Sequence, residues 1–161
     1  MIVLVMGTTG AGKTTVGKLL AENLGWNFLD ADDFHPAANI EKMKQGIPLD
    51  DADRVPWLAA IHEELNRQSA AGGNCLLACS ALKQKYRDVL SAGLDITVVY
   101  LKGSYEEMKQ HILARRGHFA GEAILAGQFA DLEEPTDAIV VFAGQTPEKI
   151  VAMLRTRLRV E

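Results

Sequence analysis

The sequence contains little cysteine: Cys75 and Cys79 are the only two among 161 residues. Both lie in the apolar stretch "CLLACS", whose composition favours a strand with the two thiols on one face. Four residues along a strand separate their Cα atoms by about 13 Å, which is too far for a disulfide. A metal site would need further ligands nearby, and the neighbouring sequence offers none. We therefore expect both cysteines to be small buried hydrophobic side chains.

An excess of positive charge and a long apolar run are also missing. The net charge is −4, whereas a nucleic-acid-binding domain usually carries a basic surplus. No stretch approaches the roughly 18 apolar residues of a membrane span. The opening "MIVLVM" is apolar but lacks the basic residues that begin a signal peptide. We expect a cytoplasmic protein that binds neither nucleic acid nor membrane.

The remaining composition is that of one globular domain over residues 1–161, with 48% hydrophobic and 24% charged residues. Apolar runs alternate with stretches of helical spacing, which predicts an α/β fold of three layers around a mostly parallel sheet. The expected strands cover 2–6, 26–30, 74–80, 95–103 and 138–142. The expected helices cover 13–24, 39–46, 55–73, 81–93, 104–117 and 146–159. The apolar residues of 116–130 fit neither the helical nor the strand period well, and we expect a lid there.

The stretch "GTTGAGKTT" follows the first apolar run and matches the phosphate-binding pattern G-x-x-x-x-G-K-[ST]. In such a loop the backbone N–H groups face the phosphates, the lysine reaches the β and γ phosphates, and the threonine hydroxyl binds Mg²⁺. The residues expected to bind the nucleotide are Gly7, Thr8, Thr9, Gly10, Ala11, Gly12, Lys13, Thr14 and Thr15.

Nucleotide binding alone leaves the class open. The guanine-reading tetrapeptide Asn/Thr-Lys-x-Asp is absent, which argues against a GTPase, and motor or transport ATPases are usually larger. A small P-loop domain favours a kinase acting on a small molecule. A non-catalytic nucleotide-sensing module is the competing class.

Acidic residues follow the second expected strand in "FLDADDFHP". Carboxylates at the carboxyl ends of parallel strands face the ligand crevice. On a continuing strand Asp30 and Asp32 would share one face, while Asp33 would point away and cap the next turn. We expect Asp30 to help hold Mg²⁺ and Asp32 to act as general base or to position the acceptor hydroxyl. An acidic turn that only feeds a helix is the alternative.

Basic residues stand at three further places that we expect to border the crevice. Arg54 lies in "PLDDADRVPWL", where Asp53 also suits the N-cap of the next helix, and Lys83 and Arg87 lie in "CSALKQKYRD". An arginine offers a planar fork to a carboxylate. Arg115 and Arg116 precede the expected lid, and an arginine brought in by closure can neutralise transition-state charge. We expect Arg115 to act in catalysis together with Lys13 and Asp32, and Arg116 to bind the nucleotide.

Together these stretches resemble the gluconate kinases of the shikimate-kinase-like P-loop group. The resemblance is carried by "GTTGAGKTT", "LDADDFHPAANIEKMKQGIPLDDADRVPWL", "CSALKQKYRD", "VYLKG" and "RRGHF…QF..LEEP", which cover about residues 3–135. The sequence departs from the family after "GHF" and in "VVFAGQTPEKI", where an acidic pair is usual before the glutamine.

The resemblance implies a P-loop NTPase fold of the nucleoside-monophosphate-kinase type with five parallel strands and a short lid. It also implies ATP-dependent phosphorylation of D-gluconate with Mg²⁺, and a homodimer. Two alternatives stay open, namely a kinase for another small acid such as shikimate and an ATP-binding regulatory module. The residues then expected to bind substrate are Asp32, His35, Arg54, Lys83, Arg87 and His118. His62 and His111, by contrast, fall inside helices away from these motifs and are expected to be structural or solvated.

Overall fold

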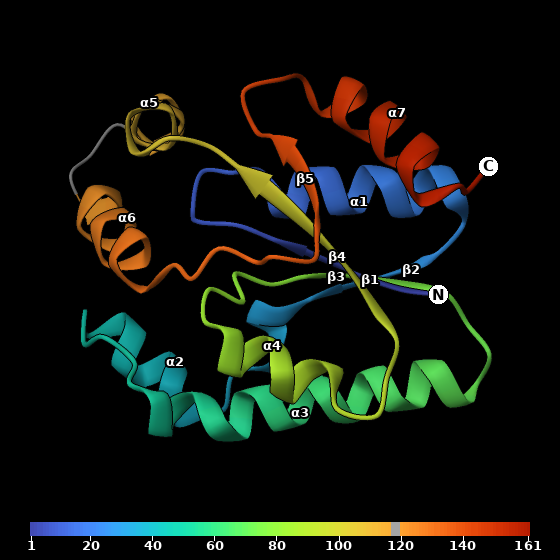
Figure 1. Cartoon of the computed structure of the whole chain (residues 1–161). Coiled ribbons are helices and arrows are strands. Elements are labelled where there is room, and N and C mark those ends of the chain that lie inside the picture. Colours follow the sequence, from blue (N-terminus) through green and yellow to red (C-terminus); the bar gives the residue numbers. More distant parts are fainter. Residues whose placement is uncertain (117–119) are drawn as a thin grey trace.

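The computed structural model describes residues 1–116 and 120–161, except for the side chains of residues 116 and 120. Strands and helices alternate as the sequence predicts (Figure 1). The strands are β1 (Ile2–Met6), β2 (Asn27–Asp30), β3 (Cys75–Ala78), β4 (Ile96–Lys102) and β5 (Ile139–Phe142). The helices are α1 (Lys13–Leu24), α2 (Ala37–Lys44), α3 (Asp51–Ala70), α4 (Gln84–Ser91), α5 (Tyr105–Arg116), α6 (Ala120–Asp131) and α7 (Pro147–Leu158), with a 3₁₀ turn η1 (Ala31–Phe34) after β2.

The five strands form one parallel sheet in the order β2-β3-β1-β4-β5, which confirms the predicted fold class. The central strand β1 pairs with β3 on one side and β4 on the other. Parallel strands place their carboxyl ends along one edge of the sheet, and ligands bind outside that edge. The loop after β1 and the turn after β2 both start there, so the fold brings the two predicted motifs to one region.

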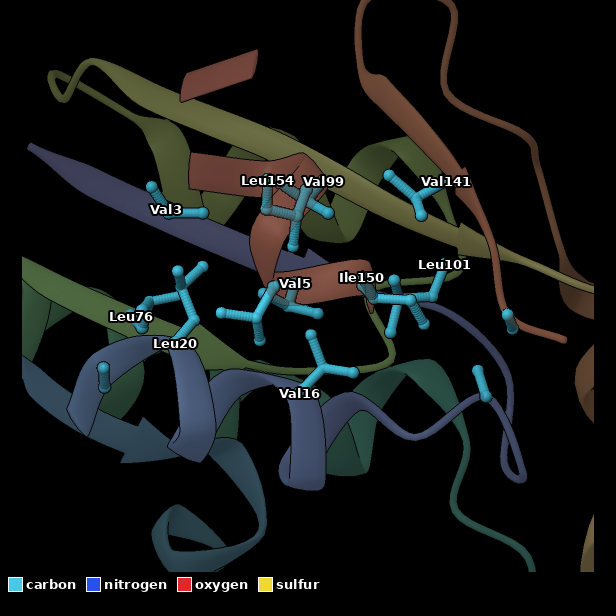
Figure 2. Close-up of a cluster of buried hydrophobic side chains, with 14 of the residues drawn as sticks. Val3, Val5, Val16, Leu20, Leu76, Val99, Leu101, Val141, Ile150 and Leu154 are labelled. Atoms are coloured by element: carbon cyan, nitrogen blue, oxygen red, sulfur yellow. The ribbon is translucent and has the colours of Figure 1, made fainter. Parts of the chain in front are cut away.

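Strand β1 is buried on both faces, which explains its uninterrupted apolar sequence. Val3 and Val5 join a cluster with α1 and α7 on one side of the sheet (Figure 2). Leu4 and Met6 join a second cluster with α3 and α4 on the other. Full burial of each such side chain contributes about 1.5–3 kcal/mol, so the base of the phosphate loop is held on both faces.

Both cysteines are free and buried, as predicted. Burial raises the pKa of Cys79 to about 12, so this thiol stays protonated. Of the helices within residues 1–116 and 120–161, none is long and apolar enough to cross a membrane.

Helix α3 begins earlier than the sequence predicts. Asp50 rather than Asp53 is its N-cap: the Asp50 carboxylate accepts from the Asp53 N–H at 2.8 Å, and the Asp53 carboxylate accepts from the Asp50 N–H at 3.0 Å. This reciprocal capping box starts the helix at Asp51, so Pro56 lies in the second turn and not the first. The same type of box, predicted for Ser104 and Glu107 before α5, is confirmed.

Most of the segment expected as a lid is the helix α6. Its apolar residues lack a clear helical period, but Leu125 is fully buried and Gly121 packs against α5. A Cβ atom on Gly121 would lie 2.4 Å from Ile112 Cγ2, so only glycine permits this approach. The helix is therefore stabilised by a tertiary contact that sequence periodicity does not reveal. Residues 117–119, between α5 and α6, lie outside the described residues.

Candidate active site

The loop from Gly7 to Thr15 joins the carboxyl end of β1 to the start of α1, as predicted. Gly10 adopts φ +85°, and a Cβ atom there would lie 2.9 Å from the carbonyl oxygen of Met108. A side chain at this position would therefore meet both an unfavourable backbone conformation and α5. Gly12 is the N-cap of α1, so the positive end of that helix faces the loop. This is the geometry of an anion site built from backbone N–H groups.

The ammonium group of Lys13 lies over this loop. Its Nζ donates a hydrogen bond to the Thr8 carbonyl at 3.0 Å. Burial lowers the pKa of Lys13, while the nearby carboxylates of Asp32 and Asp30 act in the opposite direction. A half-buried cation next to two carboxylates and a ring of N–H groups suits a polyphosphate.

Thr14 and Asp30 meet beside the loop, with Thr14 Oγ1 donating to Asp30 Oδ2 at 3.2 Å. Hydroxyl and carboxylate oxygens are the ligands that Mg²⁺ prefers, usually together with phosphate oxygens and water. These two residues therefore fit the predicted metal site. Within the described ranges no three His, Cys, Asp or Glu side chains form a metal-binding group, so the protein would supply few ligands of its own.

The turn after Asp30 differs from the continuing strand that the sequence suggested. Strand β2 ends at Asp30, and Asp30 Oδ1 accepts from the Asp32 N–H at 3.0 Å to cap the η1 turn. The capping role predicted for Asp33 thus belongs to Asp30. Desolvation and the Asp30 carboxylate raise the pKa of Asp32, whereas His35 and Lys13 lower it. The Asp32 carboxylate therefore interacts electrostatically with both Lys13 of the phosphate loop and His35.

His35 packs face to face on Trp57, with ring centroids 4.5 Å apart and planes 9° from parallel. Its Nδ1 lies 3.2 Å from the side-chain nitrogen of Asn39. Burial lowers the pKa of His35, Asp32 raises it and Arg54 lowers it again. The imidazole is therefore neutral at pH 7 and held in one orientation.

Three cations surround Tyr86 at the start of α4 and form a basic wall: Arg54, Lys83 and Lys85. Arg54 Nη1 donates to the Tyr86 hydroxyl oxygen at 3.2 Å, and Lys83 Nζ donates to Asp51 Oδ1 at 3.4 Å. Hydrogen bonds from Lys85 and Tyr86 hold the pKa of Asp51 well below its usual range. One carboxylate against three cations leaves the wall positive, which suits an anionic ligand.

Arg87 has a different position from the one the sequence suggested. It is 5% exposed, and its guanidinium donates to the carbonyl oxygens of Ala81 at 2.6 Å and Glu133 at 2.8 Å and to Gln84 Oε1 at 3.0 Å. Its donors are thus used inside the protein, where they join α4 to the chain after α6. Nothing in this geometry supports a substrate contact by Arg87.

Helices α5 and α6 contact the phosphate loop from outside. His111 Nδ1 donates to the Gly10 carbonyl at 2.8 Å, and Gln128 Oε1 accepts from the Thr9 N–H at 2.6 Å. Arg115 Nη2 lies 3.5 Å from Thr15 Oγ1, beside the loop. Sequence reasoning assigned no contact to Gln128 and placed His111 away from the motifs. No local pattern marks either contact, because both join residues about a hundred positions apart.

Two predicted site residues cannot be placed. The side chain of Arg116 and the whole of His118 lie outside the described residues. Their predicted contacts with nucleotide and substrate stay predictions.

The fold and the loop define a P-loop kinase of the type that acts on small molecules. A family model described as "Shikimate kinase" matches residues 9–125. A probable gluconokinase of Xenopus tropicalis is 43% identical over 169 residues, covering 95% of this chain and 84% of that protein. The thermoresistant gluconokinase of Escherichia coli is 41% identical, covering 94% and 89%. The crystal structure of a gluconokinase from Sinorhizobium meliloti superposes with a TM-score of 0.83 at 38% identity, covering 98% and 94%. The chain belongs to the gluconokinases, within the shikimate kinase family.

Proposed function

We propose that the protein transfers the γ-phosphoryl group of ATP to the terminal hydroxyl of D-gluconate, giving 6-phospho-D-gluconate and ADP. One observation carries this proposal. Asp32 interacts electrostatically with the Lys13 ammonium of the phosphate loop and with His35, and His35 interacts with Arg54 of the basic wall. These interactions support a phosphate site, a candidate base and a site for an anionic acceptor that neighbour one another.

The phosphate loop supports binding of ATP as the donor. Lys13 and the unpaired N–H groups of the loop would bind the phosphates, and Thr14 and Asp30 would hold Mg²⁺. When bound, the ion supplies positive charge to the β and γ phosphates. Arg115 stands beside Thr15 and would add a second cation. We propose that helix α6 closes over the nucleotide, with Arg115 on the phosphates.

Asp32 is proposed to accept the proton of the attacking primary hydroxyl. The hydroxyl oxygen then forms a bond to the γ-phosphorus, and the bond from that phosphorus to the β–γ bridging oxygen breaks. The electron pair leaves with ADP, and Asp32 later releases its proton to water. Desolvation and Asp30 raise the pKa of Asp32, which makes the carboxylate a better proton acceptor than an isolated one.

Gluconate has a carboxylate at one end and a primary alcohol at the other. The guanidinium of Arg54 suits the carboxylate, while His35 and Lys83 suit the hydroxyl groups between the two ends. Shikimate is a cyclic acid that would present a ring hydroxyl instead of a chain end. A site that binds several hydroxyls rejects analogues without them, because its polar groups then stay unpaired.

A coupled assay of ADP release tests the proposal across gluconate, shikimate and related sugar acids, with the phosphorylated product identified by mass spectrometry. Turnover of gluconate above the other acids is expected. Faster turnover of shikimate than of gluconate would refute gluconate as the substrate but would still support a kinase. ATP binding without ADP release on any acid would favour the regulatory module.

We also propose that the protein forms a homodimer, as the family resemblance implies, and that it is cytoplasmic. Light scattering on the purified protein tests the first part. A mass near twice 17.5 kDa is expected, and a mass of one chain at working concentration would contradict it.

A further inference from the structure

Asn39 in α2 is a buried polar side chain that the chemistry above does not use. It is 3% exposed. Its amide nitrogen Nδ2 donates to the Asp53 carbonyl at 2.9 Å and lies 3.2 Å from His35 Nδ1. A buried amide in this position requires both contacts, because an unpaired buried polar group destabilises the folded protein.

The Asp53 contact fixes which way the Asn39 amide faces. A carbonyl oxygen can only accept, so the atom facing it is the NH₂ group and not the amide oxygen. Asp53 itself is held by the capping box with Asp50 and by Lys42 Nζ, which donates to its carboxylate at 2.8 Å. Asn39 therefore points its second N–H at His35 Nδ1.

That N–H decides the protonation of the imidazole. Since Asn39 donates, His35 Nδ1 must accept, and the single proton of the neutral ring resides on Nε2. Within residues 1–116 and 120–161 no protein group is hydrogen-bonded to this Nε2. Protonation of Nδ1 would set two donors against each other and is disfavoured.

The ring itself has little freedom to rotate. It is stacked on Trp57, and Trp57 Nε1 donates to the Ala31 carbonyl at 2.7 Å at the end of β2. The charged groups that act on the ring are Asp32 on its own turn and Arg54 on α3. Burial and Arg54 lower the pKa of His35 and outweigh the opposing effect of Asp32, so the ring stays neutral.

We propose that Asn39 is a positioning residue that holds His35 as its neutral Nε2–H tautomer, so that the ring donates a hydrogen bond to an oxygen of the bound sugar acid. The ligand in this statement rests on the proposed function, whereas the tautomer does not. A neutral donor beside Arg54 orients a hydroxyl or carboxylate oxygen without adding a second positive charge.

Nitrogen NMR of the four imidazoles tests the tautomer directly. In a long-range ¹H–¹⁵N spectrum, with His35 assigned by loss of its signals in His35→Gln, the unmodified protein should show protonated Nε2 and bare Nδ1. A protonated Nδ1 would overturn the proposal without any substitution at Asn39. In Asn39→Asp a carboxylate oxygen, which can only accept, would face Nδ1. The proton of the neutral ring should then move to Nδ1, and both nitrogens should be protonated as the pH falls.

Kinetics then tests whether the donor contacts substrate. Asn39→Asp should raise KM for gluconate about tenfold, the effect of one lost hydrogen bond of about 1.4 kcal/mol, and leave KM for ATP within about twofold. Its gluconate KM should improve as the pH falls, since a doubly protonated ring regains the Nε2–H, whereas that of the unmodified protein, whose ring carries the Nε2–H in both protonation states, should not show this improvement. A reversed tautomer with unchanged gluconate KM would overturn the substrate contact.

The chain offers a matched control in a second asparagine–histidine pair four residues apart. Asn66 Nδ2 lies 3.4 Å from His62 Nδ1 on the exposed side of α3, and His62 Nε2 lies 2.7 Å from the Ala92 carbonyl. Asn66→Asp should change the imidazole signals of His62 and leave both KM values unchanged. If the unmodified protein does not phosphorylate gluconate, the proposed function fails, while the spectra still decide the tautomer of His35.

Discussion

The backbone N–H of Thr9 donates to Gln128 Oε1 at 2.6 Å, joining the phosphate loop to a helix 119 residues further along the chain. Gly10 of the same loop accepts from His111 of α5. The loop is thus bound to both helices α5 and α6, whose packing excludes any side chain at Gly121. The conformation of the loop and the position of α6 are consequently linked.

Gln128→Ala should loosen this link. Loss of one hydrogen bond is worth about 0.5–1.5 kcal/mol, so we expect a lower Tm, a fall in kcat/KM for ATP of about two- to tenfold, and faster hydrogen exchange in α6. Gln128→Glu keeps an acceptor oxygen and should retain the Tm, but its negative charge should weaken ATP binding. Gln110→Ala, an exposed glutamine on α5, is the control. Equal exchange in α6 for all three proteins would contradict the link.

Lys13→Ala should abolish turnover and leave the fold intact. The variant removes the cation that lies over the phosphate loop, where loss of one charge-stabilising group typically costs about 10²–10³ in kcat. Because burial opposes the charge of Lys13, the variant should be at least as stable to heat as the unmodified protein. Lys18→Ala, on the exposed side of the same helix, controls for the loss of a lysine. Normal ADP release by Lys13→Ala would remove the basis of the kinase assignment.

Asp32→Asn and Asp33→Asn separate the proposed base from its neighbour. Removal of a general base costs about 10²–10⁴ in rate, and the Asp32 carboxylate interacts electrostatically with Lys13 of the phosphate loop. We expect Asp32→Asn to lower kcat within that range with KM for ATP nearly unchanged, and Asp33→Asn to retain most activity. Single-turnover measurements would show whether the chemical step is the one affected. If Asp33→Asn lowered kcat more than Asp32→Asn, the assignment of Asp32 as the base would be wrong.

His35 should make the protein less stable as the pH falls. Its folded-state pKa lies below the unfolded value near 6.5, so the unfolded chain takes up a proton first. The contribution of His35 to the free energy of unfolding is fully present above pH 6.5 and is lost as the pH falls through the folded-state pKa. His35→Gln does not titrate and should flatten the part of the Tm–pH profile between about pH 7 and 5. Identical profiles for the two proteins would show that His35 is not the group responsible.

Features encoded by neighbouring residues could be predicted from the sequence. The buried strand β1, the phosphate loop and the capping box of Ser104 and Glu107 are each indicated by a short run of neighbouring residues, and each is confirmed. The exact residue at which a helix begins is harder to predict. Asp50 and Asp53 are both good N-caps, and only the reciprocal hydrogen bonds in the structure show that the helix begins at the first.

Features that depend on distant contacts were not predictable. Arg87 follows a strand at the crevice edge, yet its guanidinium turns inward because the Ala81 and Glu133 carbonyls accept from it. Helix α6 has no clear amphipathic period, and its packing on α5 depends on the close approach of Gly121 to Ile112, which no local pattern marks. Asp30 and Asp32 do converge on Lys13, although through a 3₁₀ turn rather than by alternation along a strand.

Arg54 and Arg87 should respond differently to the same conservative substitution. Arg54→Lys keeps the charge but loses the planar fork and the contact with Tyr86, so KM for gluconate should rise about ten- to a hundredfold, with a smaller change for ATP. Arg87→Lys would leave buried carbonyls unpaired, at about 1–3 kcal/mol, so it should lower the Tm and change KM for gluconate little. Thermal unfolding and initial rates on both variants separate a substrate contact from a structural one. If Arg87→Lys raised KM for gluconate more than Arg54→Lys at unchanged Tm, the carboxylate site would belong to α4 and the basic wall around Tyr86 would need another ligand.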